Sequence, residues 1–297
     1  MHTSQPPSLN GSFLAFARDI KLQHSIFAIP FACCGFLLMS NPVSLTVYQF
    51  TLLLLAMVSA RSFAMGFNRL VDSSIDRKNP RTKDRLIARG DLSRHHAAFW
   101  ITVFAATFVG TSFALNPLAG ALSIPLVAIF AIYSFAKRFT WAAHFILGLC
   151  LALSPLAVEI ALSANVSFAN ILLSTGILFW VAGFDTLYSL QDFEFDKTQG
   201  LFSLPSKIGI RASVKISQIS FSLAALSWVI LGLTTPLGVI YFVGLLPVIG
   251  LLIWQQIHIN NILASGDTKL KIEKIFFDSN ALVSVIFFIS LAIDKWT

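Results

Sequence analysis

The sequence is poor in charge and in cysteine. Only 12% of its 297 residues are charged and 14 are acidic, whereas 56% are hydrophobic and 28 are phenylalanine. The three cysteines, Cys33, Cys34 and Cys150, lie inside apolar stretches, without the spacing of a zinc site or of a disulfide framework. With a mean hydropathy of +0.77, these shortages exclude an ordinary soluble domain and indicate a polytopic membrane protein.

The N-terminal segment MHTSQPPSLN lacks the basic region and the small-residue cleavage site of a signal peptide, so we expect residues 1–20 to form a short cytosolic tail. A formal charge of +7 would favour a nucleic-acid partner in a soluble chain. In a membrane protein the positive-inside rule explains the same excess, and we expect no nucleic-acid partner. No linker divides the sequence, which predicts a single domain over residues 1–297.

Apolar windows long enough to cross a bilayer as helices, which takes about 17–25 residues, recur along the chain. The nine windows are approximately residues 23–40, 45–67, 96–114, 118–136, 141–163, 168–188, 213–233, 236–256 and 276–293. The sequence therefore predicts an all-α polytopic protein with nine transmembrane helices.

Lysine and arginine are almost absent from one side of this arrangement. Of the 21 such residues, 19 lie on the side of the N-terminal tail and of the loops after the second, fourth, sixth and eighth windows, including Lys215 at that end of the seventh window. Arg61 lies within a window, and only Lys295 falls on the opposite side. Because positive charge marks the cytoplasmic side, we expect a cytoplasmic N-terminus and a C-terminus outside.

Both acidic segments of the sequence lie on the predicted cytoplasmic side. The first is NRLVDSSID, in which Asn68, Asp72 and Asp76 recur every four residues. On a helix this spacing places three oxygen-bearing side chains one above another on a single face. A solvated helix end with capping acids is the alternative interpretation of such a stripe.

The second acidic segment, DTLYSLQDFEFD, repeats the pattern less regularly. Asp185, Asp192 and Asp196 follow at intervals of seven and four residues, which predicts a second stripe of the same kind. Like charges within one stripe repel, but two stripes facing one another around Mg²⁺ would be neutralised and would leave room for water and phosphate oxygens. A metal site at the cytoplasmic face is thus the favoured hypothesis.

These segments resemble the motifs of the UbiA family of intramembrane aromatic prenyltransferases, and the likeness runs from Leu22 to the last window. The first stripe matches the family's NxxxDxxxD motif, and NPRTKDR after it resembles the NPRT stretch. Asp185, Thr186 and Tyr188 match D-T-x-Y, and the last two Asp of the second stripe match DxxxD. YSFAKRFT, which begins at Tyr133, resembles the family's Y-P-x-x-K-R segment.

The resemblance implies a fold of nine helices around a central cavity that faces the cytoplasm, in the cytoplasmic (inner) membrane. It also implies a Mg²⁺-dependent polyprenyltransferase whose partners are polyprenyl diphosphate, a small aromatic acid and membrane lipid. The metal ligands would be Asn68, Asp72, Asp76, Asp192 and Asp196. The cations that neutralise the diphosphate would be Arg81, Arg85, Lys137 and Arg138.

Four further residues are candidates for acting on the aromatic acceptor and the allylic cation. Arg61 lies seven residues before the first stripe, hence on the same helix face, and would bind the acceptor's carboxylate; an ion pair with an acid such as Asp185 is the alternative. Asp185 would orient the acceptor hydroxyl or accept the ring proton. Tyr188 and Tyr133 would stabilise the allylic cation, unless they are ordinary interfacial aromatics.

Two other polar residues in the apolar windows are expected to be structural. Glu159 lies near the non-cytoplasmic end of its window, far from the proposed site, and is interpreted as a hydrogen-bonded or snorkelling acid. His144 is expected to be a buried polar residue that a neighbouring helix satisfies.

Departures from the family pattern bear on the acceptor. The second acidic segment is followed by GLFSLPSKIG, not by the G-x-K-S-T-A of typical 4-hydroxybenzoate enzymes. This resembles a sister branch that prenylates 1,4-dihydroxy-6-naphthoate, so both acceptors stay open, in ubiquinone or menaquinone biosynthesis. Haem-farnesylating and chlorophyll-synthesising branches are alternatives within the family, and a secondary transporter is the alternative from another class.

Overall fold

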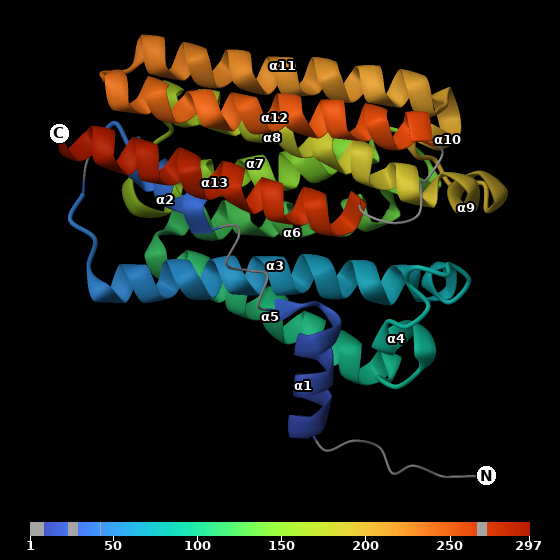
Figure 1. The fold of residues 1–297 in the computed structure, drawn as a ribbon. Coiled ribbons are helices and arrows are strands. Elements are labelled where there is room, and N and C mark those ends of the chain that lie inside the picture. Colours follow the sequence, from blue (N-terminus) through green and yellow to red (C-terminus); the bar gives the residue numbers. More distant parts are fainter. Residues whose placement is uncertain (1–8, 23–28, 42, 266–271) are drawn as a thin grey trace. The chain divides into compact units, whose positions relative to one another are not determined.

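The computed structural model describes residues 9–22, 29–41, 43–265 and 272–297. These residues form α-helices and two short 3₁₀ helices, and no strand occurs among them (Figure 1). They belong to two compact units, one comprising Met1–Ile26 with Leu45–Phe135 and the other Phe27–Ser44 with Ala136–Thr297. The expected single domain stays a prediction.

Eight helices of the described chain are long and apolar enough to cross a membrane, which confirms an all-α polytopic membrane protein. They correspond to eight of the nine predicted windows. The remaining window, 23–40, falls partly on residues 23–28, which lie outside the described residues. Its described part contains α2 (Ile29–Leu37).

The first unit is built around one long helix. Its elements are α1 (Leu9–Asp19), α3 (Val47–Asp76), α4 (Leu86–Arg89), α5 (Arg94–Leu115) and α6 (Pro117–Phe135). Helix α3 packs against both α5 and α6, as Figure 1 shows. It begins at a capping box, in which the Thr46 hydroxyl accepts from the Gln49 amide at 3.2 Å while the Gln49 side chain accepts from Thr46.

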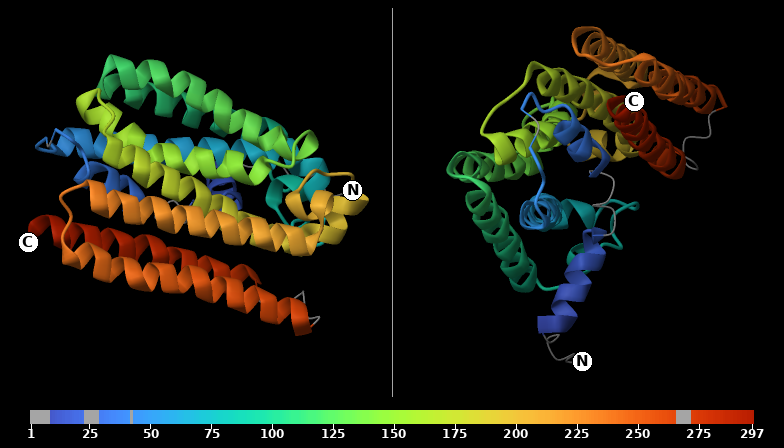
Figure 2. Two further views of the ribbon diagram at one scale, coloured as in Figure 1. Left: turned by 90° about the horizontal axis from the view of Figure 1, so that it is seen from above. Right: turned by 90° about the vertical axis from the view of Figure 1, so that its left-hand side faces the viewer.

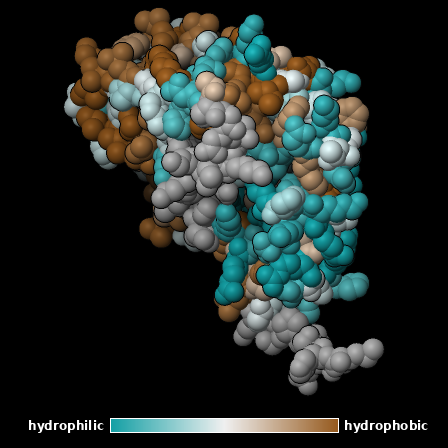
Figure 3. Space-filling view, turned by 45° about the vertical axis from the view of Figure 1, so that its right-hand side comes forward, coloured by the Kyte–Doolittle hydropathy of each residue, from teal (hydrophilic) through white to brown (hydrophobic). Residues whose placement is uncertain are grey.

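The length of α3 carries it beyond the membrane core. Its 30 residues span about 45 Å at 1.5 Å per residue, whereas a hydrocarbon core is about 30 Å thick. The last turns, which hold the first acidic segment, therefore extend past the apolar layer. In Figure 3 the side that carries α4 in Figure 1 comes forward, and hydrophilic residues gather on it.

Helix α1 lies within the expected N-terminal tail and packs on α3 and α5. Phe16 and Ile20 are fully buried, and the Trp100 indole donates to the Ser12 hydroxyl at 3.1 Å. A Cβ at Gly66 of α3 would lie 2.5 Å from the Phe16 ring, so only glycine permits this approach. Hydrophobic burial therefore attaches the amphipathic α1 to the unit.

The second unit surrounds α8 (Phe168–Tyr188), which packs against α7 (Ala143–Ser163) and α11 (Ile210–Thr234). Helix α12 (Val239–Ser265) contacts α11 and α13 (Ile272–Trp296), and these three run side by side in Figure 2. Its short elements are η2 (Ala136–Arg138), η3 (Ser189–Asp192), α9 (Phe193–Thr198) and α10 (Leu204–Ile208).

An aromatic core holds the helices of the second unit together. Trp228 of α11 is fully buried, and its ring centroid lies 5.1 Å from that of Phe287 and 6.5 Å from that of Trp180. Phe31 of α2 packs against the same group, with a centroid separation of 5.3 Å from Trp180. Side chains of this size bury the most apolar area per residue.

Candidate active site

The first acidic segment forms the end of α3, as its spacing predicted. The Asn68 side-chain amide donates to Asp72 Oδ2 at 3.2 Å, so these two side chains share one face. Both are half-buried, whereas Asp76 is buried. Arg61, seven residues before Asn68 on the same helix, is half-buried as well.

The chain after α3 folds back onto the third member of the stripe. Arg85 Nη1 donates to both carboxylate oxygens of Asp76, at 2.7 and 2.6 Å. The Thr82 hydroxyl donates to the Asp76 carbonyl at 3.2 Å. The sequence assigned Asp76 to a metal and Arg85 to a diphosphate, and the structure pairs these two residues with each other.

Helix α4 positions Arg85, and a residue of another helix caps the N-terminus of α4. Arg85 is the N-cap residue of α4 but makes no side-chain cap, and Asp19 of α1 accepts from the Leu86 amide at 2.7 Å instead. The Arg77 guanidinium donates to the Ala88 carbonyl at 2.9 Å, and Gly90 ends the helix with a positive φ of 89°. Sequence analysis missed the capping role of Asp19, because no local pattern links α1 to α4.

The other candidates of the first unit lie on separate elements. Arg81 is exposed, and its amide donates to the Asn79 side chain at 2.9 Å, which makes the turn of the NPRT stretch. Tyr133 is half-buried near the end of α6.

The second acidic segment is helical but is not one continuous α-helix. Helix α8 ends at Tyr188, as predicted, and η3 separates it from α9. Hydroxyl groups favour this change: Thr186 donates to the Ala182 carbonyl at 2.7 Å and Ser189 donates to the Thr186 carbonyl at 2.7 Å. Such back-bonds compete with regular helix hydrogen bonds and bend helices. The second stripe therefore differs in helix type from the first.

Asp192 and Asp196 are both buried, with 4% and 2% of their surface exposed. Asp196 Oδ2 has no hydrogen-bond partner among the described residues, although the Ser203 side chain hydrogen-bonds to this carboxylate. The charge of Lys137 in η2 acts on the same group. A buried carboxylate oxygen without a donor is costly unless a cation reaches it, so this donor set fits a hard divalent metal.

Asp185 lies one turn before Tyr188 at the end of α8, and both are half-buried. Asp185 Oδ2 is 2.6 Å from Nδ1 of His144, which is fully buried at the start of α7. This confirms that a neighbouring helix satisfies His144. Lys137 and Arg138 lie in η2, where the Lys137 carbonyl accepts from the Phe202 amide at 2.7 Å.

Each acidic segment contains oxygen donors of the kind that bind a divalent metal. Within the described part of the chain, no group of three or more His, Cys, Asp or Glu side chains gathers closely enough to hold a metal ion. Oxygen donors are nevertheless present in both units: Asn68, Asp72 and Asp76 in the first, and Asp192 and Asp196 in the second.

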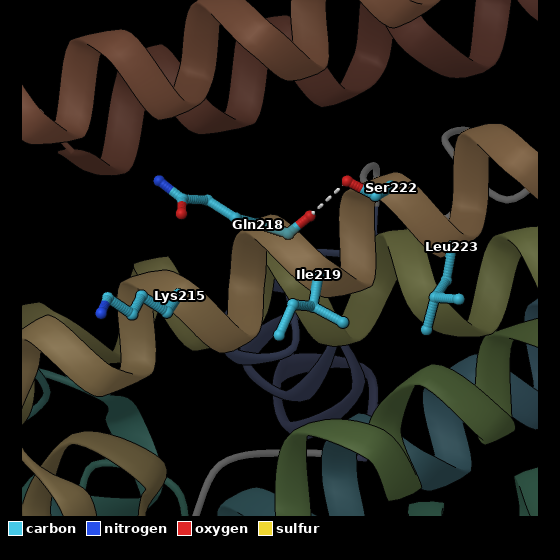
Figure 4. Close-up of a pocket in the computed structure, with 5 residues that line it drawn as sticks. All are labelled: Lys215, Gln218, Ile219, Ser222 and Leu223. Atoms are coloured by element: carbon cyan, nitrogen blue, oxygen red, sulfur yellow. Dashed lines mark hydrogen bonds between the residues drawn. The ribbon is translucent and has the colours of Figure 1, made fainter.

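A surface hollow of about 430 Å³ lies on α11 (Figure 4). Its five lining residues all come from this one helix, and the Ser222 hydroxyl donates to the Gln218 carbonyl at 3.0 Å. None of the predicted site residues lines it: the lining is Lys215, Gln218, Ile219, Ser222 and Leu223. The hollow therefore has no part in the candidate site.

An all-α membrane protein with oxygen-rich segments at helix ends has the architecture of an intramembrane transferase, and known proteins share it. Residues 28–279 match the sequence profile of the UbiA prenyltransferase family. The chain is 31% identical over 212 residues to a 4-hydroxybenzoate octaprenyltransferase from Shewanella pealeana, a match that covers 71% of this chain and 73% of that relative.

Solved structures agree with the sequence comparisons. A UbiA homologue from Aeropyrum pernix K1, solved in its apo form, superposes with a TM-score of 0.80 at 29% identity, over 92% of this chain and 98% of that one. A UbiA homologue from Archaeoglobus fulgidus bound to GPP and Mg²⁺ shares the fold, with a TM-score of 0.69 at 19% identity over 95% and 100%. The chain belongs to the UbiA prenyltransferase family and is a polyprenyltransferase.

Proposed function

We propose that the protein transfers a polyprenyl group from polyprenyl diphosphate to an aromatic ring that carries a hydroxyl and a carboxylate. The acceptor is 4-hydroxybenzoate or 1,4-dihydroxy-6-naphthoate, in ubiquinone or menaquinone biosynthesis. One observation carries the proposal: Asp196 is buried next to the buried Asp192, and its Oδ2 has no hydrogen-bond donor among the described residues. Two buried carboxylates this close together favour a bound cation, and a cation held by two carboxylates is suited to binding a diphosphate.

The residues that would hold Mg²⁺ come from both acidic segments. They are Asn68, Asp72, Asp76, Asp192 and Asp196. When bound, Mg²⁺ would withdraw charge from the diphosphate and make it a better leaving group. Arg85 donates to both oxygens of Asp76 through one nitrogen, Nη1, so its other guanidinium nitrogens would be available for a diphosphate oxygen next to this ligand.

Basic residues complete the donor site in this proposal. Arg85 and Lys137 each lie close to one of the predicted ligands, Asp76 and Asp196. Their side chains, with those of Arg81 and Arg138, would neutralise the charge that develops as the bond between the allylic carbon and the diphosphate oxygen breaks. The isoprenoid tail stays in lipid, which explains why the enzyme is embedded in a membrane.

The acceptor would bind beside the diphosphate. Arg61 would grip its carboxylate with two parallel hydrogen bonds, and Tyr188 and Tyr133 would stabilise the allylic cation with their ring faces. A ring carbon next to the hydroxyl then forms the new carbon–carbon bond. Asp185 would orient that hydroxyl or accept the ring proton, whose loss restores aromaticity.

The proposed orientation places the active site at the cytoplasmic face of the cytoplasmic membrane, with the N-terminus inside and the C-terminus outside. It rests on the distribution of lysine and arginine, of which 19 of 21 lie on the predicted inner side. A reporter fused after Thr297 is expected to be inaccessible from the cytoplasm, and a cytoplasmic signal would refute the proposed orientation.

The assay that tests the function uses membranes that contain the protein. They are incubated with radiolabelled polyprenyl diphosphate, Mg²⁺ and each aromatic acid in turn, with EDTA as the metal-free control. Labelled product with one of the two acids supports the proposal and identifies the acceptor. If only a porphyrin were labelled, the protein would belong to the haem or chlorophyll branch, and the proposed aromatic-acid acceptor would be wrong. Absence of transfer to any acceptor would refute the proposal.

A further inference from the structure

His144 lies at the start of α7 and has no exposed surface, yet both of its ring nitrogens face polar atoms. On one side, Nδ1 is 2.6 Å from Asp185 Oδ2 of α8. On the other, the Leu204 backbone amide donates to Nε2 at 3.4 Å. The imidazole therefore bridges the end of α8 and the first residue of α10, all within the second unit.

These two contacts determine where the imidazole proton sits. A backbone N–H can only donate, so Nε2 must present its lone pair to Leu204. The proton of the neutral ring is then on Nδ1, where it points at Asp185 Oδ2. His144 thus donates to the carboxylate, and the contact with Leu204 keeps the ring in that tautomer.

The hydrogen bond leaves the two oxygens of Asp185 in different situations. Oδ2 is held by His144, whereas Oδ1 accepts no hydrogen bond from the residues described in the second unit. The Asp185 side chain is 21% exposed and the His144 side chain 0%. Because His144 has no exposed surface, it cannot pass a proton from Asp185 on to solvent. The imidazole therefore does not serve as a proton relay.

The same bridge reaches the segment that follows the DxxxD motif. Leu204 comes directly after Ser203, which caps α10 and hydrogen-bonds the Asp196 carboxylate. His144 therefore stands between the group proposed for the acceptor and the loop that supports a proposed metal ligand. No motif quoted for the family includes this histidine.

We propose that His144 is a positioning residue: it holds one oxygen of Asp185 so that the other faces the aromatic acceptor. The inference rests on the proposed function, since it assigns a partner to Asp185 in that reaction. The effect tested is on orientation; His144 also lies close enough to Asp196 to act on it electrostatically, and donor KM reports that second effect. Loss of orientation at a reacting group, even by about 1 Å, can lower turnover by about 10²-fold.

Two substitutions separate the two contacts of the imidazole. In His144→Asn the side-chain amide nitrogen takes the place of Nδ1 and still donates to Asp185. In His144→Gln the amide group takes the place of Nε2, and its oxygen still accepts from Leu204. His144→Leu removes both contacts at similar volume, and His95→Asn, at an exposed site on α5, is the control.

Turnover with a saturating donor, acceptor KM and donor KM are measured for each variant, together with thermal unfolding in detergent. We expect turnover to fall about 10- to 100-fold in His144→Leu and His144→Gln, while donor KM changes by less than about twofold. His144→Asn should recover most of the turnover, and His95→Asn should behave like the unaltered protein.

Three results would overturn the inference. Recovery by Gln but not by Asn would assign the role to the Leu204 contact. Equal changes in donor and acceptor parameters in both the Asn and the Gln variant would assign His144 to structure alone. Unchanged turnover in folded His144→Gln would remove any role in orientation. If instead the unaltered protein labels no acceptor, it is the proposed function that fails.

Discussion

Two acids of the second unit, the buried Glu159 and the half-buried Asp185, lie on the adjacent helices α7 and α8 and have opposite surroundings. Glu159 is fully buried and accepts from five donor groups. Ser40 supplies two donors at 3.2 and 3.5 Å, Ser167 supplies two at 2.9 and 2.8 Å, and Asn170 supplies one at 2.7 Å. Among the described residues of the second unit, Asp185 has one donor, His144, and 21% of its side chain is exposed.

The difference separates an acid that stabilises a fold from one available for chemistry. The donors to Glu159 come from three segments: the chain after α2, the N-cap of α8 and the first turn of α8. With both oxygens satisfied, Glu159 ties these segments together and has no capacity left for a ligand. Asp185 has one oxygen anchored and the other open, which is the arrangement that a positioned general base requires.

The largest expected effect lies with Asp192, a buried acid that we propose as a metal ligand. Asp192→Ala should lower Mg²⁺-dependent release of diphosphate from the donor by about 10³-fold, because a ligand of the leaving group's counterion is lost. Release of labelled diphosphate measures it. Glu194→Ala, two residues further along at an exposed position of α9, should change it by less than about twofold. Equal rates of diphosphate release in the two variants would contradict the assignment of Asp192 as a metal ligand.

Removing Glu159 should act on stability and not on chemistry. In Glu159→Ala the buried donors lose their acceptor, and the free energy of unfolding should fall by about 3 kcal/mol. Thermal unfolding in detergent measures this loss, and Glu159→Gln should lose less. If acceptor KM rose while stability stayed constant, the contrast between Glu159 and Asp185 would be wrong.

For Asp185→Asn we expect the reverse pattern. The amide oxygen still accepts from His144, so the unfolding transition should stay near that of the unaltered protein. Turnover with the aromatic acid should fall by about 10²-fold, because the group can no longer accept a proton. Steady-state kinetics with a saturating donor measure it, and normal turnover would remove Asp185 from the mechanism.

Arg61 extends the comparison to the first unit, where a half-buried cation lies within a membrane-spanning helix. In Arg61→Ala the acceptor KM should rise by about 30-fold, which corresponds to the free energy of a hydrogen bond between charged groups. The donor KM should change little. Arg61→Lys keeps the charge but not the paired donors and should restore only part of the affinity. A parallel rise in both KM values would argue against carboxylate recognition.

The smallest effect is expected at the N-cap of α8. Ser167→Ala removes the cap and one donor to Glu159, which should lower the free energy of unfolding by about 1 kcal/mol. Donor and acceptor KM should both be unchanged. A change in either KM would show that the region around Glu159 is coupled to the C-terminal end of α8, where Asp185 lies.

Much of the fold was predictable because it follows from local periodicity. All eight candidate membrane spans of the described residues coincide with predicted apolar windows. The four-residue spacing of Asn68, Asp72 and Asp76 predicted that these residues lie on one helix, and they form the end of α3. The prediction for the second segment was less accurate. Hydroxyl back-bonds at Thr186 and Ser189 accompany a 3₁₀ turn there, and spacing alone does not reveal such a turn.

Partners that are distant in sequence were not predictable in the same way. His144 meets Asp185 across 41 positions, and Asp19 caps α4 across 67. The Arg85–Asp76 pair is only nine positions apart, yet it depends on a turn that reverses the chain. In each case the sequence contains both partners but no periodic pattern that joins them.

By itself, the sequence determined the class of fold, the uneven distribution of lysine and arginine and the residue types of the proposed diphosphate site, because hydropathy and helical spacing are local properties. Only the tertiary structure decided which acids are saturated and which are open. That distinction depends on donors from other helices, such as those that surround Glu159 and the one that holds Asp185. Packing brings these groups together, and buried polar groups must find such partners or remain unsatisfied.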